Sequence, residues 1–212
     1  MDEVMFTVTD VKQMGYCARI AYYAYCLPGL TPAPTYKMEA GALAGRKTEE
    51  LEHRRSLRAY GLKEEPDEAA GEAGREFDVW LESPKLGLRG RLDMLIEAAG
   101  ELIPVDYKDS DPRPVAKRGA GPRQAQHNWQ VQLAAYALLL EEARGQSVQR
   151  GFIYYIPERR ARPVAITEDL KTVVIESVGR MRDIIARERM PDATPYRGRC
   201  QACEYRRFCN DV

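Results

Sequence analysis

Two carboxylates and a lysine in this chain have the spacing that a metal-dependent nuclease needs. Asp93 interrupts an otherwise apolar segment, and Asp106 and Lys108 stand two residues apart in the next one. Carboxylates that converge on one point hold a hard cation such as Mg²⁺ or Mn²⁺, and a nearby lysine can orient a water for attack on phosphorus. A solvated ion pair is the ordinary alternative for Asp-x-Lys alone. The apolar neighbours of Asp93 favour burial instead, and a buried charge needs a partner or a metal.

A histidine and two helical side chains could complete such a site. His53 lies in a charged segment and is a candidate further ligand, although a lone histidine of this kind is more often a surface residue. Gln132 and Tyr136 are four residues apart, so on a helix they face the same way. By themselves these two indicate only a helix with a half-buried tyrosine.

The cysteines form a second candidate centre. Cys200, Cys203 and Cys209 crowd the C-terminal end, and Cys17 lies near the start of the chain. A C-x2-C pair cannot easily close a relaxed disulfide on itself, and clustered cysteines in a reducing compartment favour metal ligation. Thiolate sites suit both zinc and a four-cysteine iron–sulfur cluster, so the spacing leaves both open. We interpret Cys26 as a small packed residue, but it could replace Cys17 as a ligand.

Composition narrows the class of protein without revealing a partner. The 212 residues suit one domain, or one domain with a small appendage. The 32 basic and 32 acidic residues cancel, so net charge says nothing about nucleic acid. No apolar run approaches the roughly 20 residues of a membrane-spanning helix, and the acidic N-terminus lacks an apolar signal core. We therefore expect a cytoplasmic protein with no membrane contact.

The candidate catalytic residues belong to a predicted hairpin. Residues 86–96 and 102–107 are apolar enough for two strands, and residues 98–101 supply the turn between them. If the strands pair, Asp93 lies close to the carboxylate of the next strand. That carboxylate and Lys108 then face the same side of the sheet, because side chains alternate along a strand.

The remaining elements must surround this hairpin. The first helix is predicted to be capped by Thr9 or Asp10 and to run without a break past Cys17. The full series of expected elements is a strand stub at 6–8, helices at 11–25 and 38–60, strands at 77–81, 86–96 and 102–107, a helix at 122–143, strands at 148–156 and 163–166, and a helix at 168–189. This mixed order predicts an α/β fold.

In combination, these motifs resemble the RecB-type branch of the PD-(D/E)xK nucleases. The matching array is His53, Gly90-Arg91-Leu92-Asp93, Pro104-Val105-Asp106-Tyr107-Lys108 and Gln132-x3-Tyr136. The resemblance implies a restriction-endonuclease-like α/β nuclease core. One departure is that Asp106 stands where the family often has a glutamate.

The resemblance also implies a role for each residue of the array. Lys108 would assist the nucleophile, and Gln132 and Tyr136 would pack beside the site and help to fix Lys108 and the DNA. The ligands of Mg²⁺ or Mn²⁺ would be His53, Asp93, Asp106 and the backbone carbonyl of Tyr107.

The cysteines extend the resemblance to the CRISPR-associated RecB-like exonucleases, the Cas-four family. Cys17-Ala18-Arg19 and the three C-terminal cysteines match that family, and similar arrangements occur in AddB and Dna-two type helicase-nucleases. The resemblance implies a structural 4Fe–4S cluster that joins the terminal segments and is held by Cys17, Cys200, Cys203 and Cys209. Three parts follow: residues 1–30 with one cluster ligand, a nuclease core at 31–190 and a cluster-binding tail at 191–212.

In this family the implied activity is Mg²⁺- or Mn²⁺-dependent DNA exonuclease chemistry, and an endonuclease activity is compatible with it. The implied role is in CRISPR adaptation: trimming pre-spacer 3′ overhangs and selecting pre-spacers that carry the protospacer-adjacent motif. The implied partners are DNA with single-stranded 3′ overhangs and the Cas-one/Cas-two integrase, sometimes fused to the Cas-one part.

Two other functions compete with this reading. One is a DNA-repair nuclease of the same fold. The other is a non-catalytic nucleic-acid-binding module with a zinc or iron–sulfur tail, against which the complete array of acids and lysine argues.

Basic clusters and tyrosines could contact DNA. Phosphates need cations near the scissile bond, and unpaired bases stack on aromatic rings; a solvated charged face with core tyrosines is the alternative. The residues concerned are Arg54, Arg55, Arg58, Arg113, Lys117, Arg118, Arg123, Arg197, Arg199, Arg206 and Arg207, with Tyr22, Tyr23, Tyr25 and Tyr60.

Overall fold

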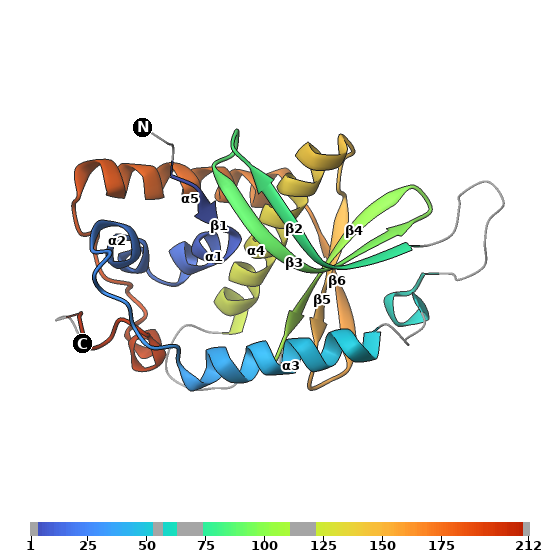
Figure 1. Ribbon diagram of the computed structural model, residues 1–212, viewed down its shortest axis with the longest axis horizontal. Coiled ribbons are helices and arrows are strands. Elements are labelled where there is room, and N and C mark those ends of the chain that lie inside the picture. The colour runs from blue at the N-terminus through green and yellow to red at the C-terminus, as the bar shows by residue number, and fades with distance from the viewer. Residues whose placement is uncertain (1–3, 53–56, 63–73, 111–121, 210–212) are drawn as a thin grey trace.

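A mixed β-sheet with helices on both faces forms the protein in a computed structural model of residues 1–212 (Figure 1). The structure describes residues 4–52, 57–62, 74–110 and 122–209. The strands of the sheet are β1 (Phe6–Thr7), β2 (Gly74–Ser83), β3 (Leu88–Ala98), β4 (Glu101–Lys108), β5 (Arg150–Tyr155) and β6 (Arg160–Ala165). The helices are α1 (Val8–Tyr16), α2 (Arg19–Cys26), α3 (Tyr36–Glu52), α4 (Pro122–Arg144) and α5 (Glu168–Arg187), with 3₁₀ turns at Leu57–Tyr60 and Arg197–Ala202.

The predicted hairpin of β3 and β4 is confirmed. Met94 pairs with Val105 and Ala98 with Glu101 in an antiparallel ladder. Ala99 and Gly100 make the two-residue turn with φ of 51° and 74°, which is the geometry that favours tight hairpins. The pairing brings the segment that carries Asp93 alongside the segment that carries the Asp-x-Lys motif.

The two edges of β3 are used differently. Strand β2 pairs along almost the whole of one edge, from Leu88 to Glu97. A strand has only two edges, so β4 and β1 share the other one: β4 takes residues 94–98 and β1 takes residues 88–89. Asp93 therefore lies at the point where the neighbouring strands diverge.

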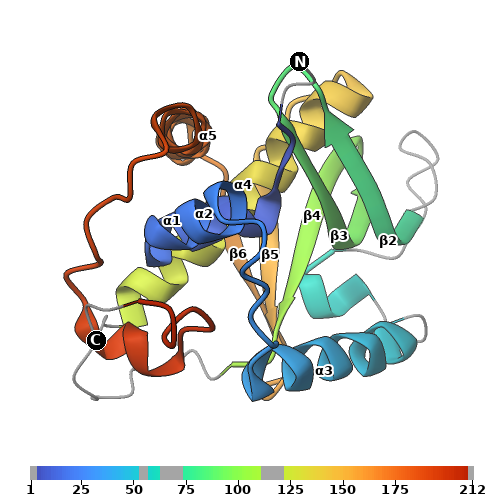
Figure 2. The ribbon, with the colours of Figure 1, turned by 60° about the vertical axis from the view of Figure 1, so that its left-hand side comes forward.

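Helix α4 makes the crossover between β4 and β5, which are parallel. It packs on one face of the sheet together with α1 and α5, while α3 lies on the opposite face, beside β4 (Figure 2). The smaller core on the α3 side contains Val105 and Tyr107. Because side chains alternate along a strand, Asp106 and Lys108 face α1 and α4 instead.

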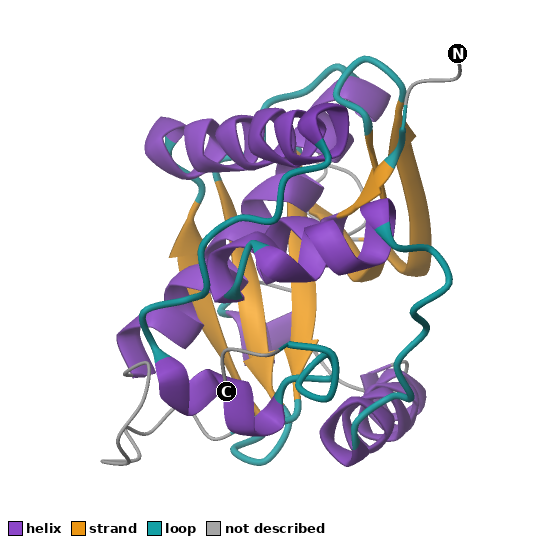
Figure 3. Ribbon diagram, turned by 90° about the vertical axis from the view of Figure 1, so that its left-hand side faces the viewer, coloured by secondary structure: helices purple, strands orange, loops and turns teal. Residues whose placement is uncertain are grey.

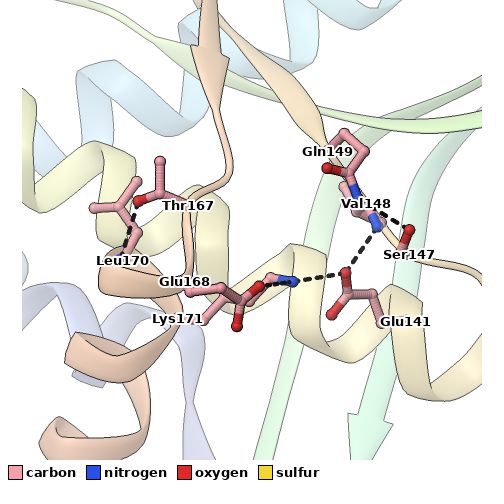
Figure 4. A network of polar contacts seen from close by, with 8 residues as sticks. All are labelled: Glu141, Ser147, Val148, Gln149, Thr167, Glu168, Leu170 and Lys171. Carbon is pink, nitrogen blue, oxygen red and sulfur yellow. Dashed lines mark hydrogen bonds and ion pairs between the residues drawn. The ribbon is translucent and has the colours of Figure 1, made fainter.

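A polar network fixes the C-terminal half of α4 to the start of α5 (Figure 4). Lys171 Nζ lies 2.9 Å from Glu141 Oε1 and 3.0 Å from Glu168 Oε1, and the Val148 N–H donates to the same Glu141 Oε1 at 2.7 Å. Thr167 caps α5 by accepting from the Leu170 N–H at 3.3 Å, which confirms the predicted start of this helix. The network holds α4, and with it the Gln132–Tyr136 segment, against the sheet.

Three predictions about the N-terminal helices are wrong in detail. The N-cap of α1 is Thr7, whose hydroxyl and N–H exchange hydrogen bonds with Asp10, so Asp10 is the reciprocal partner and not the cap. The expected single helix is two, because Cys17 adopts an extended conformation at the end of α1. Of the helix predicted at 38–60, the described residues up to Glu52 are α-helical as α3, whereas Leu57–Tyr60 form a 3₁₀ turn.

The N-terminal helices and the C-terminal segment lie beside each other (Figure 3). Among the described residues, no helix has the length and apolar character needed to cross a membrane.

Candidate active site

The sheet divergence brings the predicted acids and lysine together. The Tyr107 N–H donates to Asp93 Oδ2 at 2.6 Å, so a backbone group of β4 holds the carboxylate of β3. Lys108 Nζ forms an ion pair with Asp106 Oδ2. The Asp106 side chain is only 4% exposed and that of Lys108 13%. Asp106 and Lys108 therefore do not form the solvent-exposed ion pair that is the ordinary alternative for an Asp-x-Lys motif.

The two carboxylates are short of partners for buried ions. Burial, followed by the negative charge of Asp106, raises the pKa of Asp93 well above its usual range. Lys108 and the Tyr107 N–H oppose this shift without cancelling it. Asp106 Oδ2 is buried, and within the described ranges Lys108 is its ion-pair partner. Two such carboxylates repel each other, and a divalent cation between them would remove the repulsion, so this donor set fits Mg²⁺ or Mn²⁺.

A cavity of about 180 Å³ opens on Asp93 from the α3 side. Tyr107 lines it from the sheet, and Arg46 and Glu49 line it from α3. Glu49 adds to the negative potential that raises the pKa of Asp93. The predicted ligand His53 lies outside the described residues, four positions after Glu49 in the sequence.

Tyr136 and Gln132 lie beside these carboxylates, as the helical spacing suggested. The Tyr136 hydroxyl donates to the Arg91 carbonyl at 2.7 Å, two residues before Asp93. Burial, then the charges of Asp106 and Asp93, raise the pKa of Tyr136 beyond its usual range. Gln132 lies near the Tyr136 hydroxyl and opposes the rise in its pKa, while its buried Oε1 has no hydrogen-bond partner in the described part of the chain.

Gly90 explains how Tyr136 comes so close to β3. A Cβ at this position would lie 2.7 Å from Val8 Cγ2 and 3.0 Å from Tyr136 Cε1. Only glycine leaves room for both side chains on the strand that carries Asp93.

Sequence reasoning missed Lys12 at this site. Lys12 lies on α1, close enough to Asp106, Lys108 and Asp93 for their charges to act on it. Burial, then the charge of Lys108, lowers its pKa to about 8. The available signal was weak: Lys12 and Gln13 are two polar residues between the buried Val11 and Met14 of the first helix, and such residues are ordinarily solvated.

The four predicted cluster ligands are brought together at the other end of α1. One cavity is lined by Cys17, Cys200, Cys203 and Cys209. Cys26 is elsewhere, with its Sγ 3.8 Å from the Ile184 carbonyl, which agrees with its interpretation as a packed residue. Burial raises the pKa of Cys203 to about 11. In the described ranges, no group of three His, Cys, Asp or Glu side chains is arranged to hold a metal ion.

The same region is joined by ordinary protein contacts, and we call this set of contacts between α1–α2 and residues 191–209 the clasp. Arg199 Nη1 donates to the Gly15 and Tyr16 carbonyls at 2.8 and 2.7 Å, and the Tyr16 hydroxyl donates to the Arg199 carbonyl. Arg19 donates to the Pro191 carbonyl at 2.9 Å and lies 3.4 Å from Cys209 Sγ.

Some residues predicted to contact DNA are instead structural. Arg199 is 7% exposed and its guanidinium lies 4.5 Å from the centre of the Tyr196 ring. Tyr23 and Tyr60 are 3% and 4% exposed, because Tyr23 stacks on Tyr205 and Tyr60 belongs to the smaller core. Tyr22 and Tyr25 are partly buried against the main core, whereas Arg197, Arg206 and Arg207 are exposed. The structure does not describe the side chains of Arg54, Arg55, Arg58, Arg113, Lys117, Arg118 and Arg123.

The chain is similar in sequence to known nucleases. The chain matches the PD-(D/E)XK nuclease superfamily over residues 7–210. It is 31% identical to the CRISPR-associated exonuclease Cas4 of Aeropyrum pernix over 97% of this chain and 94% of that protein. Identity to the CRISPR-associated exonuclease Cas4 of Francisella tularensis subsp. novicida is 28%, over 99% of this chain and 96% of the relative.

Two further similarities concern assembly and fold. A CRISPR-associated exonuclease Cas4/endonuclease Cas1 fusion of Leptospira interrogans is 27% identical over 70% of this chain and 27% of its own length. A solved structure described as "Crystal structure of SSO0001" superposes with a TM-score of 0.51 at 16% identity, covering 99% of this chain and 88% of that one. That likeness shows the fold alone.

Proposed function

Since the chain belongs to the Cas4 family of CRISPR-associated exonucleases, within the PD-(D/E)XK nuclease superfamily, we propose that it hydrolyses DNA phosphodiesters with Mg²⁺ or Mn²⁺ held at the β3–β4 divergence. One observation carries the proposal. Asp93, Asp106 and Lys108, from two adjoining strands, meet in a buried place where the repulsion between the carboxylates exceeds what Lys108 offsets.

The metal ligands in this proposal are Asp93, Asp106, the Tyr107 carbonyl and His53, the last on the strength of the family resemblance. When bound, the ion would polarise the phosphate and lower the pKa of a water molecule. The chain does the positioning. The Tyr107 N–H holds Asp93 in one orientation, and Lys108, on the same strand face as Asp106, is placed to orient the attacking water.

Gln132 and Tyr136 act in this proposal as positioning residues. Tyr136 ties α4 to the Arg91 carbonyl, which fixes β3 just before Asp93. Gln132 lies on the same face of α4, next to the Tyr136 hydroxyl. Their contribution is to keep two strands and a helix in register around the site, because a small misplacement of catalytic groups costs rate steeply.

The cysteine cavity is proposed to hold a 4Fe–4S cluster. Its support is that four thiols from the two ends of the chain line one cavity, which is the donor set of such clusters. The thiolates of a cluster bind different iron atoms, so they need not converge on a single ion position. Bound there, the cluster would add a covalent connection to the hydrogen bonds of the clasp.

We place the activity in CRISPR adaptation, where it would trim the 3′ overhangs of pre-spacer DNA and select pre-spacers that carry the protospacer-adjacent motif. The names of the relatives support the CRISPR setting. Fusion of related nucleases to Cas1 endonuclease supports the Cas1/Cas2 integrase as the partner. A repair nuclease of the same fold is disfavoured by these relatives.

The decisive experiment is cleavage of duplex DNA with single-stranded 3′ overhangs in Mn²⁺ or Mg²⁺. We expect Lys108→Ala to lower the single-turnover rate by at least about 10²-fold, the scale of one lost acid–base or positioning group, while DNA affinity changes little. Lys85→Ala, an exposed lysine in the β2–β3 turn, is the matched control. Metal-dependent cleavage by Lys108→Ala at the wild-type rate would refute the assignment of Lys108, and no cleavage by the wild type would refute the nuclease proposal.

A further inference from the structure

A second cavity reaches toward the active site through Lys12. It has a volume of about 310 Å³ and lies among α1, the start of α3, α4 and the C-terminal segment. The residues of this cavity that matter here are Lys12, Gln13, Tyr16, Asn128, Trp129 and Glu204. Its size is at the lower end of the range for small-molecule and cofactor sites, so it is suited to one nucleotide and not to a duplex.

Lys12 connects this cavity to the catalytic groups. It lines the cavity and lies close to Lys108 and Asp106. No hydrogen bond or ion pair joins Lys12 to another described residue. A partly buried ammonium group without a direct partner is costly, and the charge of Lys108 adds to that cost. The nearby carboxylates of Asp106, Glu204 and Asp93 offset only part of it. An anionic ligand beside both lysines would offset that cost.

The scissile phosphate and its neighbours are such anions. Lys108 pairs with Asp106 in the active site, whereas Lys12 lines the cavity. Trp129, on the cavity wall, supplies an aromatic surface of the kind on which unpaired bases stack without regard to sequence. A phosphate at Lys12 would thus be followed by a base in the cavity.

We propose that Lys12 is a further phosphate-binding residue of this nuclease, contributed by the N-terminal helix, and that the cavity it shares with Trp129 receives the nucleotide next to the cleaved bond of a single strand. This inference rests on the proposed nuclease function. It assigns α1 a direct part in substrate binding, besides its part in the clasp.

The test compares Lys12→Met with wild type in the cleavage of a single-stranded oligonucleotide with Mn²⁺. We expect kcat/KM to fall by about tenfold to a hundredfold, the effect of losing one charge-assisted hydrogen bond. The slope of log kcat/KM against log salt should become shallower by about 0.7, as for one lost phosphate contact on a single strand. Lys12→Arg should retain the wild-type slope, and Lys85→Met should leave both quantities unchanged.

A methylphosphonate scan locates the contact. Neutralising one linkage beside the cleaved bond should slow the wild type and leave Lys12→Met no slower than before. The inference is overturned if Lys12→Met keeps the wild-type rate and salt slope, or if each methylphosphonate slows both proteins equally. If Lys12→Met is insoluble, the test uses Lys12→Arg. A slope of log kcat/KM against log salt that is shallower in Lys12→Arg than in wild type contradicts the proposal. A wild type that cleaves nothing would instead refute the nuclease function itself.

Discussion

The active site and the clasp differ in how well their buried polar groups are paired. In the active site, Asp93 and Asp106 lie close enough for their charges to repel, and Lys108 offsets that repulsion only in part. In the clasp, Arg199 donates to two carbonyls at the end of α1 and lies over two tyrosine rings. The first arrangement costs stability and gains a place for a cation, whereas the second arrangement stabilises the fold.

This contrast predicts which property of the protein each kind of substitution should change. Changes in the clasp should alter folding and cofactor content before they alter chemistry. Changes at the acids should abolish chemistry and leave the fold intact or more stable.

The largest effect is expected for Cys203→Ser. Ligation of a structural metal centre contributes folding free energy, so this variant should lose most of its iron and sulfide together with its soluble yield. Anaerobic purification, an absorption spectrum and quantification of iron, sulfide and zinc measure this.

Cys26→Ser is the matched control, because Cys26 lies outside the cysteine cavity, and it should keep the wild-type iron content. One zinc and no iron in the wild type would replace the cluster by a zinc site. A fully iron-loaded Cys203→Ser would remove Cys203 from the ligand set.

A smaller effect is expected for Arg199→Lys, which retains the charge but not the forked donor group. Losing two charge-assisted hydrogen bonds to the Gly15 and Tyr16 carbonyls should lower the free energy of unfolding by about 2 kcal/mol. The melting temperature of the purified protein measures this, with the exposed Arg207→Lys as a control. Cleavage per folded molecule should stay close to wild type. A selective loss of activity at unchanged stability would show that the clasp takes part in chemistry.

The smallest effect, opposite in sign, is expected for Asp93→Asn in metal-free protein. The pKa of Asp93 is raised by burial and by Asp106, so the protonated form is favoured in the folded state. The stability that protonated Asp93 contributes is therefore fully present below the usual carboxyl pKa near 4. It is lost as the pH rises through the pKa of Asp93 in the folded protein. At pH 8 we expect Asp93→Asn to be more stable than wild type by about 1 kcal/mol, although inactive.

Melting temperatures at pH 5 and pH 8, with and without Mn²⁺, provide the measurement. Mn²⁺ should stabilise the wild type more at pH 8 and have little effect on Asp93→Asn. If the melting temperatures of wild type and Asp93→Asn change equally between pH 5 and pH 8, the inferred repulsion between Asp93 and Asp106 is contradicted.

Local spacing determined much of the nuclease core. The β3–β4 hairpin followed from two apolar runs and the Ala99-Gly100 turn, and the shared face of Asp106 and Lys108 followed from alternation along one strand. These features depend on residues close in sequence, so the pattern contains the information. The N-terminal helix was predicted less well, although its signals are local: Thr7 caps α1 through Asp10, and the extended Cys17 separates α1 from α2.

The sequence by itself determined the type of chemistry: two acids and a lysine on neighbouring strands, and four cysteines suited to a metal centre. Only the tertiary structure decided which cysteine from the N-terminal helices joins the tail, that Arg199 is buried, and that Lys12 stands beside Lys108. The physical reason is separation along the chain. Strand alternation is a short-range rule, whereas the meeting of α1 with residues near 200 depends on how the whole sheet and its helices pack.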